Sequence, residues 1–102
     1  MELVVNKELY QLYASSYFDK IIPELSAYLD KGIIEACNFF ELDHIKKLKV
    51  YLYDNAEEYQ KLFKTLYPLN GIAGCFGYED VKIYADLNKI DKHRLFTCIL
   101  YE

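Results

Sequence analysis

Apolar residues recur every three or four positions along the first half of the chain, which is the period of an amphipathic helix. The apolar positions of this stripe are Phe18, Ile21, Ile22, Leu25, Leu29, Ile33, Cys37 and Phe40. Pro23 is compatible with a helix in its first turn, and Gly32 weakens a helix interior, so a kink or two abutting helices stay open. The pattern predicts a long helix from about Tyr17 to Phe40.

A second helix is predicted after residue 55. Asp54–Asn55 suits a helix N-cap, and Glu57–Glu58 follows in the first turn, where the helix dipole favours acidic side chains. The apolar stripe of this helix is Tyr59, Leu62, Phe63 and Leu66. Residues 68–71, which contain a proline and a glycine, are typical of a helix end.

Residues 91–102 predict a third helix. Asp91 suits its N-cap. The apolar residues of one face are Leu95, Phe96, Ile99 and Leu100. No glycine, asparagine or proline follows before Glu102 to stop the helix. A core-facing helix without a stop signal favours a domain that is truncated at its C-terminal helix.

The clearest strand is predicted at Leu48–Tyr53, where apolar and tyrosine positions alternate. Val50 and Leu52 fall on one side of this strand, and Tyr51 and Tyr53 fall on the other. Such alternation is the period of a half-buried strand.

Two shorter strands are predicted at residues 72–77 and 81–86. Gly74 and Gly77 in the first of them allow a bulge. The second alternates apolar and polar residues, so one of its faces is expected to contact water. Residues 8–14 are rich in Tyr and Leu without a clean alternation, and strand and helical turn both stay open for them.

This order of elements is typical of an α+β domain with α/β-like features. We expect a single domain over residues 1–102. It would contain a small mixed sheet of three or four strands, packed against a long N-terminal helix, a middle helix and a C-terminal helix. Hydrophobic residues make up 53% of the chain and aromatic residues 17%, which favours a packed core. Buried tyrosines need hydroxyl partners, so many of the eleven are expected at the core edge or on a contact surface.

Charge and composition argue against several classes of function. The net charge is −4 and the only basic run, Lys46–Lys49, is short, so we expect no nucleic-acid partner. The N-terminus lacks the features of a signal peptide, and no stretch approaches the ~18 apolar residues that span a membrane. Cys37, Cys75 and Cys98 are widely spaced, which predicts thiols in a reducing cytosol and a cytoplasmic protein.

Six segments, taken in order, carry a likeness to a known family. They are Asn38–Leu42, Lys49–Tyr53, Asp54–Tyr59, Gly71–Phe76, Val81–Tyr84 and Ile99–Glu102. Together they resemble the N-terminal half of a minimal gluzincin-type, or zincin-like, zinc metallopeptidase domain. The likeness covers roughly residues 15–102. It implies that this chain is the N-terminal subdomain of such a fold.

The resemblance implies that the end of the last helix is the place of the HExxH zinc motif. In that motif, two histidines one helical turn apart hold zinc, and the glutamate between them is the general base. Here Tyr101 replaces the first histidine, Glu102 aligns with the glutamate, and no second histidine follows. We therefore expect no catalytic residue, metal ligand or cofactor in this chain, with zinc bound only if the missing C-terminal half is supplied.

Other residues form no catalytic or metal-binding constellation. His44 and His93 are the only histidines and lie far apart in the sequence. His93 and Glu102 fall on opposite sides of the predicted last helix. Ser15–Ser16 has no histidine pattern nearby, and Cys98 is not a helical neighbour of His93, so a core position is expected for this thiol.

The leading hypothesis is a non-catalytic protein-association domain built on a zincin-like fold. We expect it to form a homodimer, or to bind another protein, through surfaces that a missing second half leaves uncovered. The residues expected there are Leu95, Phe96, Ile99 and Leu100 on the last helix and Val81, Ile83 and Tyr84 on a free strand edge. The resemblance also makes residues 81–86 a candidate for docking an extended peptide by strand addition.

Two alternative functions stay open. The first is the N-terminal portion of a zinc-dependent peptidase whose HExxH half is missing from this chain. The second is a sensor that binds a small ligand in an aromatic pocket. Its candidate residues, which also fit the rim of a core, are Tyr10, Tyr13, Tyr17 and Tyr28. A contiguous exposed patch of these tyrosines would mark an interface.

Overall fold

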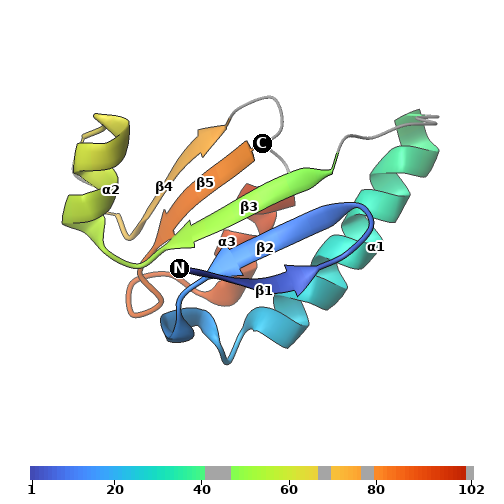
Figure 1. Ribbon diagram of the computed structural model, residues 1–102, viewed down its shortest axis with the longest axis horizontal. Coiled ribbons are helices and arrows are strands. Elements are labelled where there is room, and N and C mark those ends of the chain that lie inside the picture. The colour runs from blue at the N-terminus through green and yellow to red at the C-terminus, as the bar shows by residue number, and fades with distance from the viewer. Residues whose placement is uncertain (41–46, 67–69, 77–79, 101–102) are drawn as a thin grey trace.

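Within the residues that the structure describes, five strands form one mixed sheet that packs with three α-helices, as the computed structural model shows (Figure 1). The structure describes residues 1–40, 47–66, 70–76 and 80–100, apart from the side chains of residues 36–40, 75, 76 and 100. In chain order the elements are β1 (Glu2–Asn6), β2 (Tyr10–Ala14), the 3-10 turn η1 (Ser16–Phe18), α1 (Ile22–Phe40), β3 (Leu48–Tyr53), α2 (Ala56–Phe63), β4 (Ile72–Phe76), β5 (Asp80–Ala85) and α3 (Lys92–Leu100).

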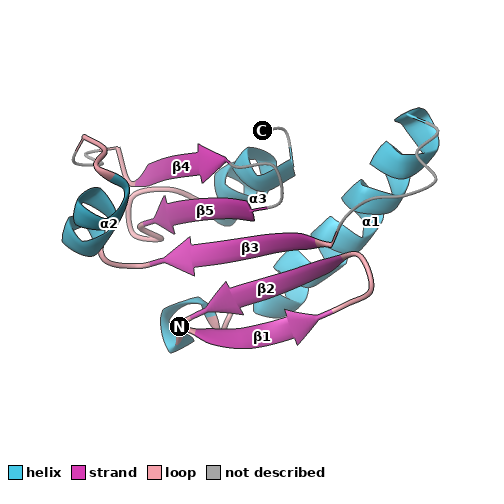
Figure 2. Cartoon of the chain, turned by 45° about the horizontal axis from the view of Figure 1, so that its top comes forward, coloured by secondary structure: helices cyan, strands magenta, loops and turns pink. Residues whose placement is uncertain are grey.

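The strands lie in the order β1-β2-β3-β5-β4, and the three central strands run parallel. β1 and β4 form the two edges of the described sheet and run antiparallel to β2 and β5 (Figure 2). Parallel neighbours need a crossover, and α1 supplies it between β2 and β3. The predicted α+β class is confirmed. The sheet has more strands than the three or four expected, because residues 2–6 pair with β2.

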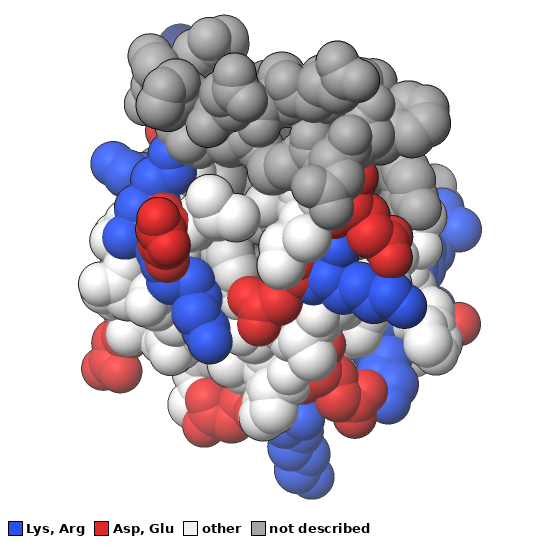
Figure 3. All heavy atoms as spheres, turned by 90° about the vertical axis from the view of Figure 1, so that its right-hand side faces the viewer, with Lys and Arg blue, Asp and Glu red and all other residues white. Residues whose placement is uncertain are grey.

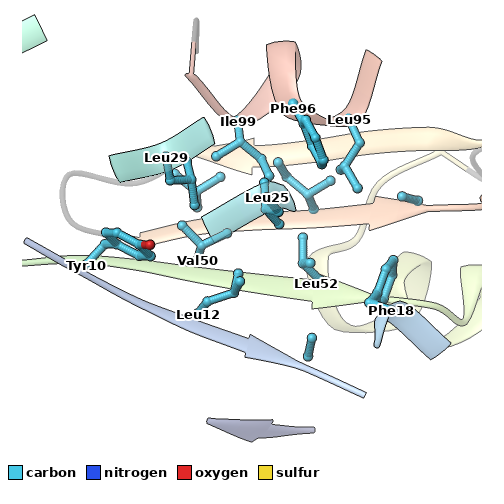
Figure 4. Packing of buried hydrophobic residues seen from close by; sticks show 14 of the residues in the cluster. Tyr10, Leu12, Phe18, Leu25, Leu29, Val50, Leu52, Leu95, Phe96 and Ile99 are labelled. Carbon is cyan, nitrogen blue, oxygen red and sulfur yellow. The ribbon is translucent and has the colours of Figure 1, made fainter. Parts of the chain in front are cut away.

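The core lies between one side of the sheet, here called the helix side, and the helices α1 and α3 (Figure 4). Its buried residues are Tyr10, Leu12, Ala14, Val50, Leu52, Val81, Ile83 and Ala85 from the strands, and Phe18, Leu25, Leu29, Ile33, Leu95, Phe96 and Ile99 from the helical segments. Alternate strand residues and helix residues three or four apart meet in one layer, as the two periods require.

α1 is one continuous helix, so the long helix predicted from the apolar stripe is confirmed, although it begins later than expected. Residues Ser16–Phe18 form a separate 3-10 turn before it. Pro23 stands in the first turn of α1, where its missing N–H costs no helical hydrogen bond. Gly32 lies inside the helix, which continues through it.

α2 begins where predicted but ends earlier. The Oδ1 atom of Asn55 accepts a hydrogen bond from the Glu58 N–H at 3.0 Å, which caps the first turn. The helix ends before Lys64, which adopts a left-handed conformation with a φ of 50°. The prediction that the helix continues to the following proline and glycine is wrong. Leu66, which lies beyond the end of the helix, is 91% exposed, and Leu62 inside the helix is 56% exposed.

Several smaller predictions are settled by the strand register. In the segment 8–14, for which strand and helix stayed open, residues 10–14 form β2, which pairs with a strand on each side. Gly74 pairs with Ile83 in an unbroken register, so no bulge forms at that glycine, and Gly77 lies outside the described residues. The irregularity lies instead in β1, where Val4 is the extra residue between Leu3 and Val5.

Gly71 is the position where the fold requires a glycine. Its φ is 81°, in the region that side-chain-bearing residues rarely adopt. A Cβ atom at this position would lie 2.7 Å from the Cβ of Lys89, so a larger residue would collide with the turn before α3. The Gly71 carbonyl accepts a hydrogen bond from the Asp86 N–H at 2.7 Å, which fastens the start of β4 to the end of β5.

Candidate functional site

The apolar face of α3 is buried in the core and is therefore not the association surface that the sequence predicts. Leu95, Phe96 and Ile99 are 0%, 3% and 3% exposed, and they face residues of α1 and the sheet (Figure 4). Helical periodicity shows that a helix has an apolar face, but it does not show which element covers that face. The side chain of Leu100 lies outside the described residues.

The strand that carries Val81, Ile83 and Tyr84 is not a free edge. β5 pairs with β3 on one side and with β4 on the other, so its backbone has no open side for a docked peptide. Val81 and Ile83 are buried in the core. Tyr84 is buried on the opposite side of the sheet, where the ring of Tyr59 lies 6.1 Å from its own. The predicted docking edge at residues 81–86 is therefore wrong.

The positions of the possible metal-binding side chains can be compared where the structure describes them. Among those described side chains, which do not include Cys37 and Cys75, no three or more His, Cys, Asp or Glu residues gather closely enough to hold an ion. His93 is exposed at the start of α3, with its ring 6.3 Å from that of Phe96. His44, Tyr101 and Glu102 lie outside the described residues.

Ser15 and Cys98, which were also considered from the sequence, both contact other parts of the fold. The Ser15 hydroxyl donates a hydrogen bond to the Asp54 carboxylate at 2.9 Å. Cys98 is half-buried and packs against the core, where the sequence predicts it. Among the described residues, no helix is long and apolar enough to cross a membrane.

The four tyrosines considered for a ligand pocket do not come together. Tyr10 lies in the core, and Tyr28 packs with its ring 5.3 Å from that of Phe96. Tyr13 lies on the opposite side of the sheet, because it alternates with core residues along β2. Tyr17 is partly exposed, and its hydroxyl accepts a hydrogen bond from the Leu87 N–H at 2.9 Å.

Among the described residues, the hydroxyls of Tyr10 and Tyr53 have a raised pKa. Burial raises the pKa of Tyr10 above 10.0; its hydrogen bond with Ser26 lowers it and its bond to Asp30 raises it. The Tyr10 hydroxyl lies 2.7 Å from the Ser26 hydroxyl and donates to the Asp30 carboxylate at 3.0 Å, which ties β2 to α1. Burial also raises the pKa of Tyr53, and the charge of Glu58 adds to that rise.

A hollow of about 190 Å³ lies between the β1–β2 turn and α1. Its lining residues are Lys7, Glu8, Leu9, Tyr10, Asp30, Ile33 and Ile34. Among the described lining residues, Tyr10 is the single aromatic one, and its hydroxyl already has partners on α1. The hollow is therefore not the aromatic pocket expected of a small-ligand sensor.

The side of the sheet away from α1 and α3, here called the open side, carries tyrosines where the helix side carries mostly aliphatic residues. Tyr13 and Tyr51 stack with their ring centroids 4.7 Å apart and their planes 11° from parallel. The register places Leu3 beside Tyr13 and Lys82 beside Tyr51. One row of side chains thus crosses four strands.

α2 covers the adjoining part of the open side. The Tyr59 hydroxyl donates a hydrogen bond to the Lys82 carbonyl at 2.9 Å. The rings of Tyr59 and Phe63 lie 5.6 Å and 5.4 Å from that of Tyr53. Because Tyr59 also reaches Tyr84, this half of the open side is closed by the helix.

The β1 edge, residues Glu2–Lys7, is the exposed surface with the properties of a docking site. Within the part of the chain that the structure describes, β1 pairs with β2 alone, so its outer backbone groups face away from the sheet. Met1, Leu3 and Val4 beside that backbone are 54%, 45% and 37% exposed. Sequence reasoning overlooked this strand. The signal that could have found it is the run of β-branched and aliphatic residues at positions 3–5.

Charge does not mark a competing site on the end of the molecule that Figure 3 shows, where acidic and basic side chains are interspersed. No protein-family model, curated protein or solved structure matches this chain. The function is therefore inferred from the chemistry of the described surfaces. Among these, the β1 edge has the properties of a docking site.

Proposed function

We propose that this chain is a non-catalytic protein-association domain that acts by strand pairing at the β1 edge. The observation that supports the proposal is an edge strand with exposed apolar side chains and one unpaired backbone side. Strand addition to such an edge supplies main-chain hydrogen bonds for affinity and alternate side chains for specificity. The association surface thus moves from the last helix and β5, where the sequence predicted it, to β1.

The row of side chains on the open side extends this surface inward from the edge. Leu3 and the stacked pair Tyr13 and Tyr51 offer apolar area with hydroxyl groups, and such residues are enriched at protein interfaces. The partner of the β1 edge is expected to be a second copy or another protein. The three widely spaced cysteines favour a reducing, cytoplasmic setting for it.

The proposal is tested by measuring mass with light scattering over a wide range of protein concentration. We expect the wild-type chain to shift from monomer to dimer as concentration rises. Leu3→Lys places a charge beside the edge and is expected to keep the chain monomeric. Leu62→Lys, which charges a similarly exposed residue on α2, is the matched control and should associate like the wild type. A dimer that Leu3→Lys does not weaken would remove the β1 edge as the surface, and a wild-type chain that stays monomeric at every concentration would leave only a different protein as the partner.

A second candidate function is the N-terminal portion of a zinc-dependent peptidase, with the zincin-like descent that the resemblance implies. Its support is the resemblance: α3, which is packed against α1 and β5, is followed in the sequence by Tyr101 and Glu102. Those two residues align with the start of the HExxH motif in the resemblance.

The peptidase alternative is tested by reading the codons after that of Glu102 in the natural gene. A histidine three residues further on would supply the second histidine of the motif. Because Tyr101 stands at the first position, the longer chain is expected to bind zinc stoichiometrically and cleave peptides only if two further protein ligands also follow downstream. A stop codon at that point, or a longer chain without zinc, contradicts it.

A further inference from the structure

We propose that the partner of the β1 edge is a second copy of this chain, paired antiparallel with Glu2 of each copy opposite Lys7 of the other. This inference rests on the proposed function and names its partner and its register. In the assembly, the two sheets would join into one continuous sheet across a two-fold axis.

For the four β1 residues that have a partner in β2, the side of the sheet follows from that partner. Leu3 pairs with Tyr13, and Asn6 pairs with Gln11; these β2 residues alternate with the core and lie on the open side. The other two paired residues of β1, Glu2 and Val5, lie opposite Ala14 and Leu12 and therefore on the helix side. In any antiparallel pairing, directly opposed residues share one side of the sheet.

Among the registers of β1 against a second β1 that this rule allows, one pairs Leu3 with Asn6, whose open-side positions are fixed by their partners in β2. Setting Leu3 opposite Asn6 of the second copy keeps open-side residues together, and it places Val4 opposite Val5. Sliding the strands by one residue sets Leu3 against Val5, which belong to different sides. The same register sets Glu2 opposite Lys7 at both ends of the paired region.

Charge complementarity is the observation that selects a second copy as the occupant. Glu2 and Lys7 are exposed, and within the described residues neither has an ion-pair partner in its own chain. Between them, the segment Leu3–Asn6 carries no charge that would repel a neighbouring strand. Opposite charges that face each other across an antiparallel pair stabilise the pairing.

The bulge at Val4 supports a competing interpretation, in which the outer edge of β1 stays unpaired and the chain is a monomer. Natural edge strands use bulges to avoid pairing with other chains, and a bulged β1 would then belong to a protected monomer. The two explanations differ in what they predict for charge exchange at Glu2 and Lys7, because a protected monomer has no second copy to respond.

The test is a charge swap measured by sedimentation equilibrium at low ionic strength. Glu2→Lys and Lys7→Glu each place like charges at both ends of the pairing, and each is expected to raise the dimer Kd roughly tenfold. The double variant restores opposite charges and is expected to return the Kd toward the wild-type value. Glu57→Lys on α2 makes the same charge change away from the edge and should leave the Kd unchanged. Added salt should shrink the differences.

The outcomes separate this inference from the function on which it rests. If the wild type dimerises and Leu3→Lys abolishes the dimer, but the charge variants behave like the wild type, the edge is used in another register and the inference fails alone. If the wild type is monomeric throughout, the inference fails, and the proposed function keeps only its other partner, a different protein. Far-ultraviolet circular dichroism of each variant confirms that it is folded in either case.

Discussion

The two sides of the sheet use the same strands to build very different surfaces. On the helix side, Leu12 and Leu52 are fully enclosed by α1 and α3 (Figure 4). On the open side, the neighbouring residues Tyr13 and Tyr51 are half-buried and stack on each other. The comparison shows that a strand with period-two alternation need not have a polar outer side. Tyrosine fills that side with a ring that packs and a hydroxyl that tolerates water.

The largest difference between the two sides is expected in the free energy of unfolding when adjacent residues of β3 are replaced by alanine. Leu52→Ala removes a fully buried side chain and leaves a cavity, so we expect a loss of about 2–5 kcal/mol in the free energy of unfolding. Tyr51→Ala is the matched variant on the open side and should cost clearly less. Urea unfolding followed by circular dichroism measures both. Equal losses would contradict the assignment of one covered and one open side.

A smaller effect is expected at the cap of α2, the helix that closes half of the open side. Asn55→Ala removes the acceptor for the Glu58 N–H and should lower the free energy of unfolding by about 1 kcal/mol. Asn55→Asp keeps an acceptor oxygen and should behave like the wild type in the same urea titration. If the aspartate variant is as unstable as the alanine variant, the cap is not the cause.

The stacked pair on the open side is expected to contribute less again. A double-mutant cycle with Tyr13→Ala and Tyr51→Ala should give a coupling free energy of about 0.5–1.5 kcal/mol. Leu52→Ala combined with Tyr13→Ala is the control cycle, because these residues lie on different sides, and its coupling should be near zero. A coupling near zero for the tyrosine pair would mean that the stack adds nothing beyond burial.

The smallest effect concerns Tyr10, the tyrosine of the helix side. Its pKa is raised above 10.0 in the folded state, mainly by burial, so the folded protein holds the phenol proton more tightly than the unfolded chain does. The resulting stability is fully present below pH 10.0 and is lost as the pH rises through the folded-state value.

Tyr10→Phe removes this titration and supplies the comparison. From about pH 8 to about pH 11, the wild type should lose free energy of unfolding relative to the phenylalanine variant. Urea titrations of both proteins across that range measure the difference. A difference that stays constant with pH would show that Tyr10 ionises equally in the folded and unfolded chains.

Periodicity predicted the elements whose sequence carries an unambiguous period. β3 occupies the predicted residues, because Leu48–Tyr53 alternates without interruption. α3 begins after its predicted cap, since the Arg94 N–H donates to the Asp91 carboxylate at 2.9 Å. The order of layers followed from these elements, which is why the α+β class could be recognised before the structure.

The candidate site could not be predicted in the same way, because it depends on which surfaces cover each other. The apolar faces of α3 and β5 were visible in the sequence, but only the fold shows that they cover each other and the face of α1. β1 is too short, and its bulge at Val4 breaks the alternation that would have revealed it. α2 ends early because Lys64 adopts a left-handed backbone conformation. Lysine rarely adopts that conformation, so the sequence gives no sign of it.

The sheet order has a consequence for how the chain reaches its native state. Two local hairpins, β1–β2 and β4–β5, lie on either side of β3, which is parallel to both of its neighbours. Hairpins form over short stretches of chain, whereas the parallel pairings close long loops and are entropically slow. We therefore expect the two hairpins to form first and β3 to pair with both of them late in folding. Until β3 pairs, the edges of β2 and β5 that it will occupy stay unpaired, and a strand of a second chain could pair with them instead.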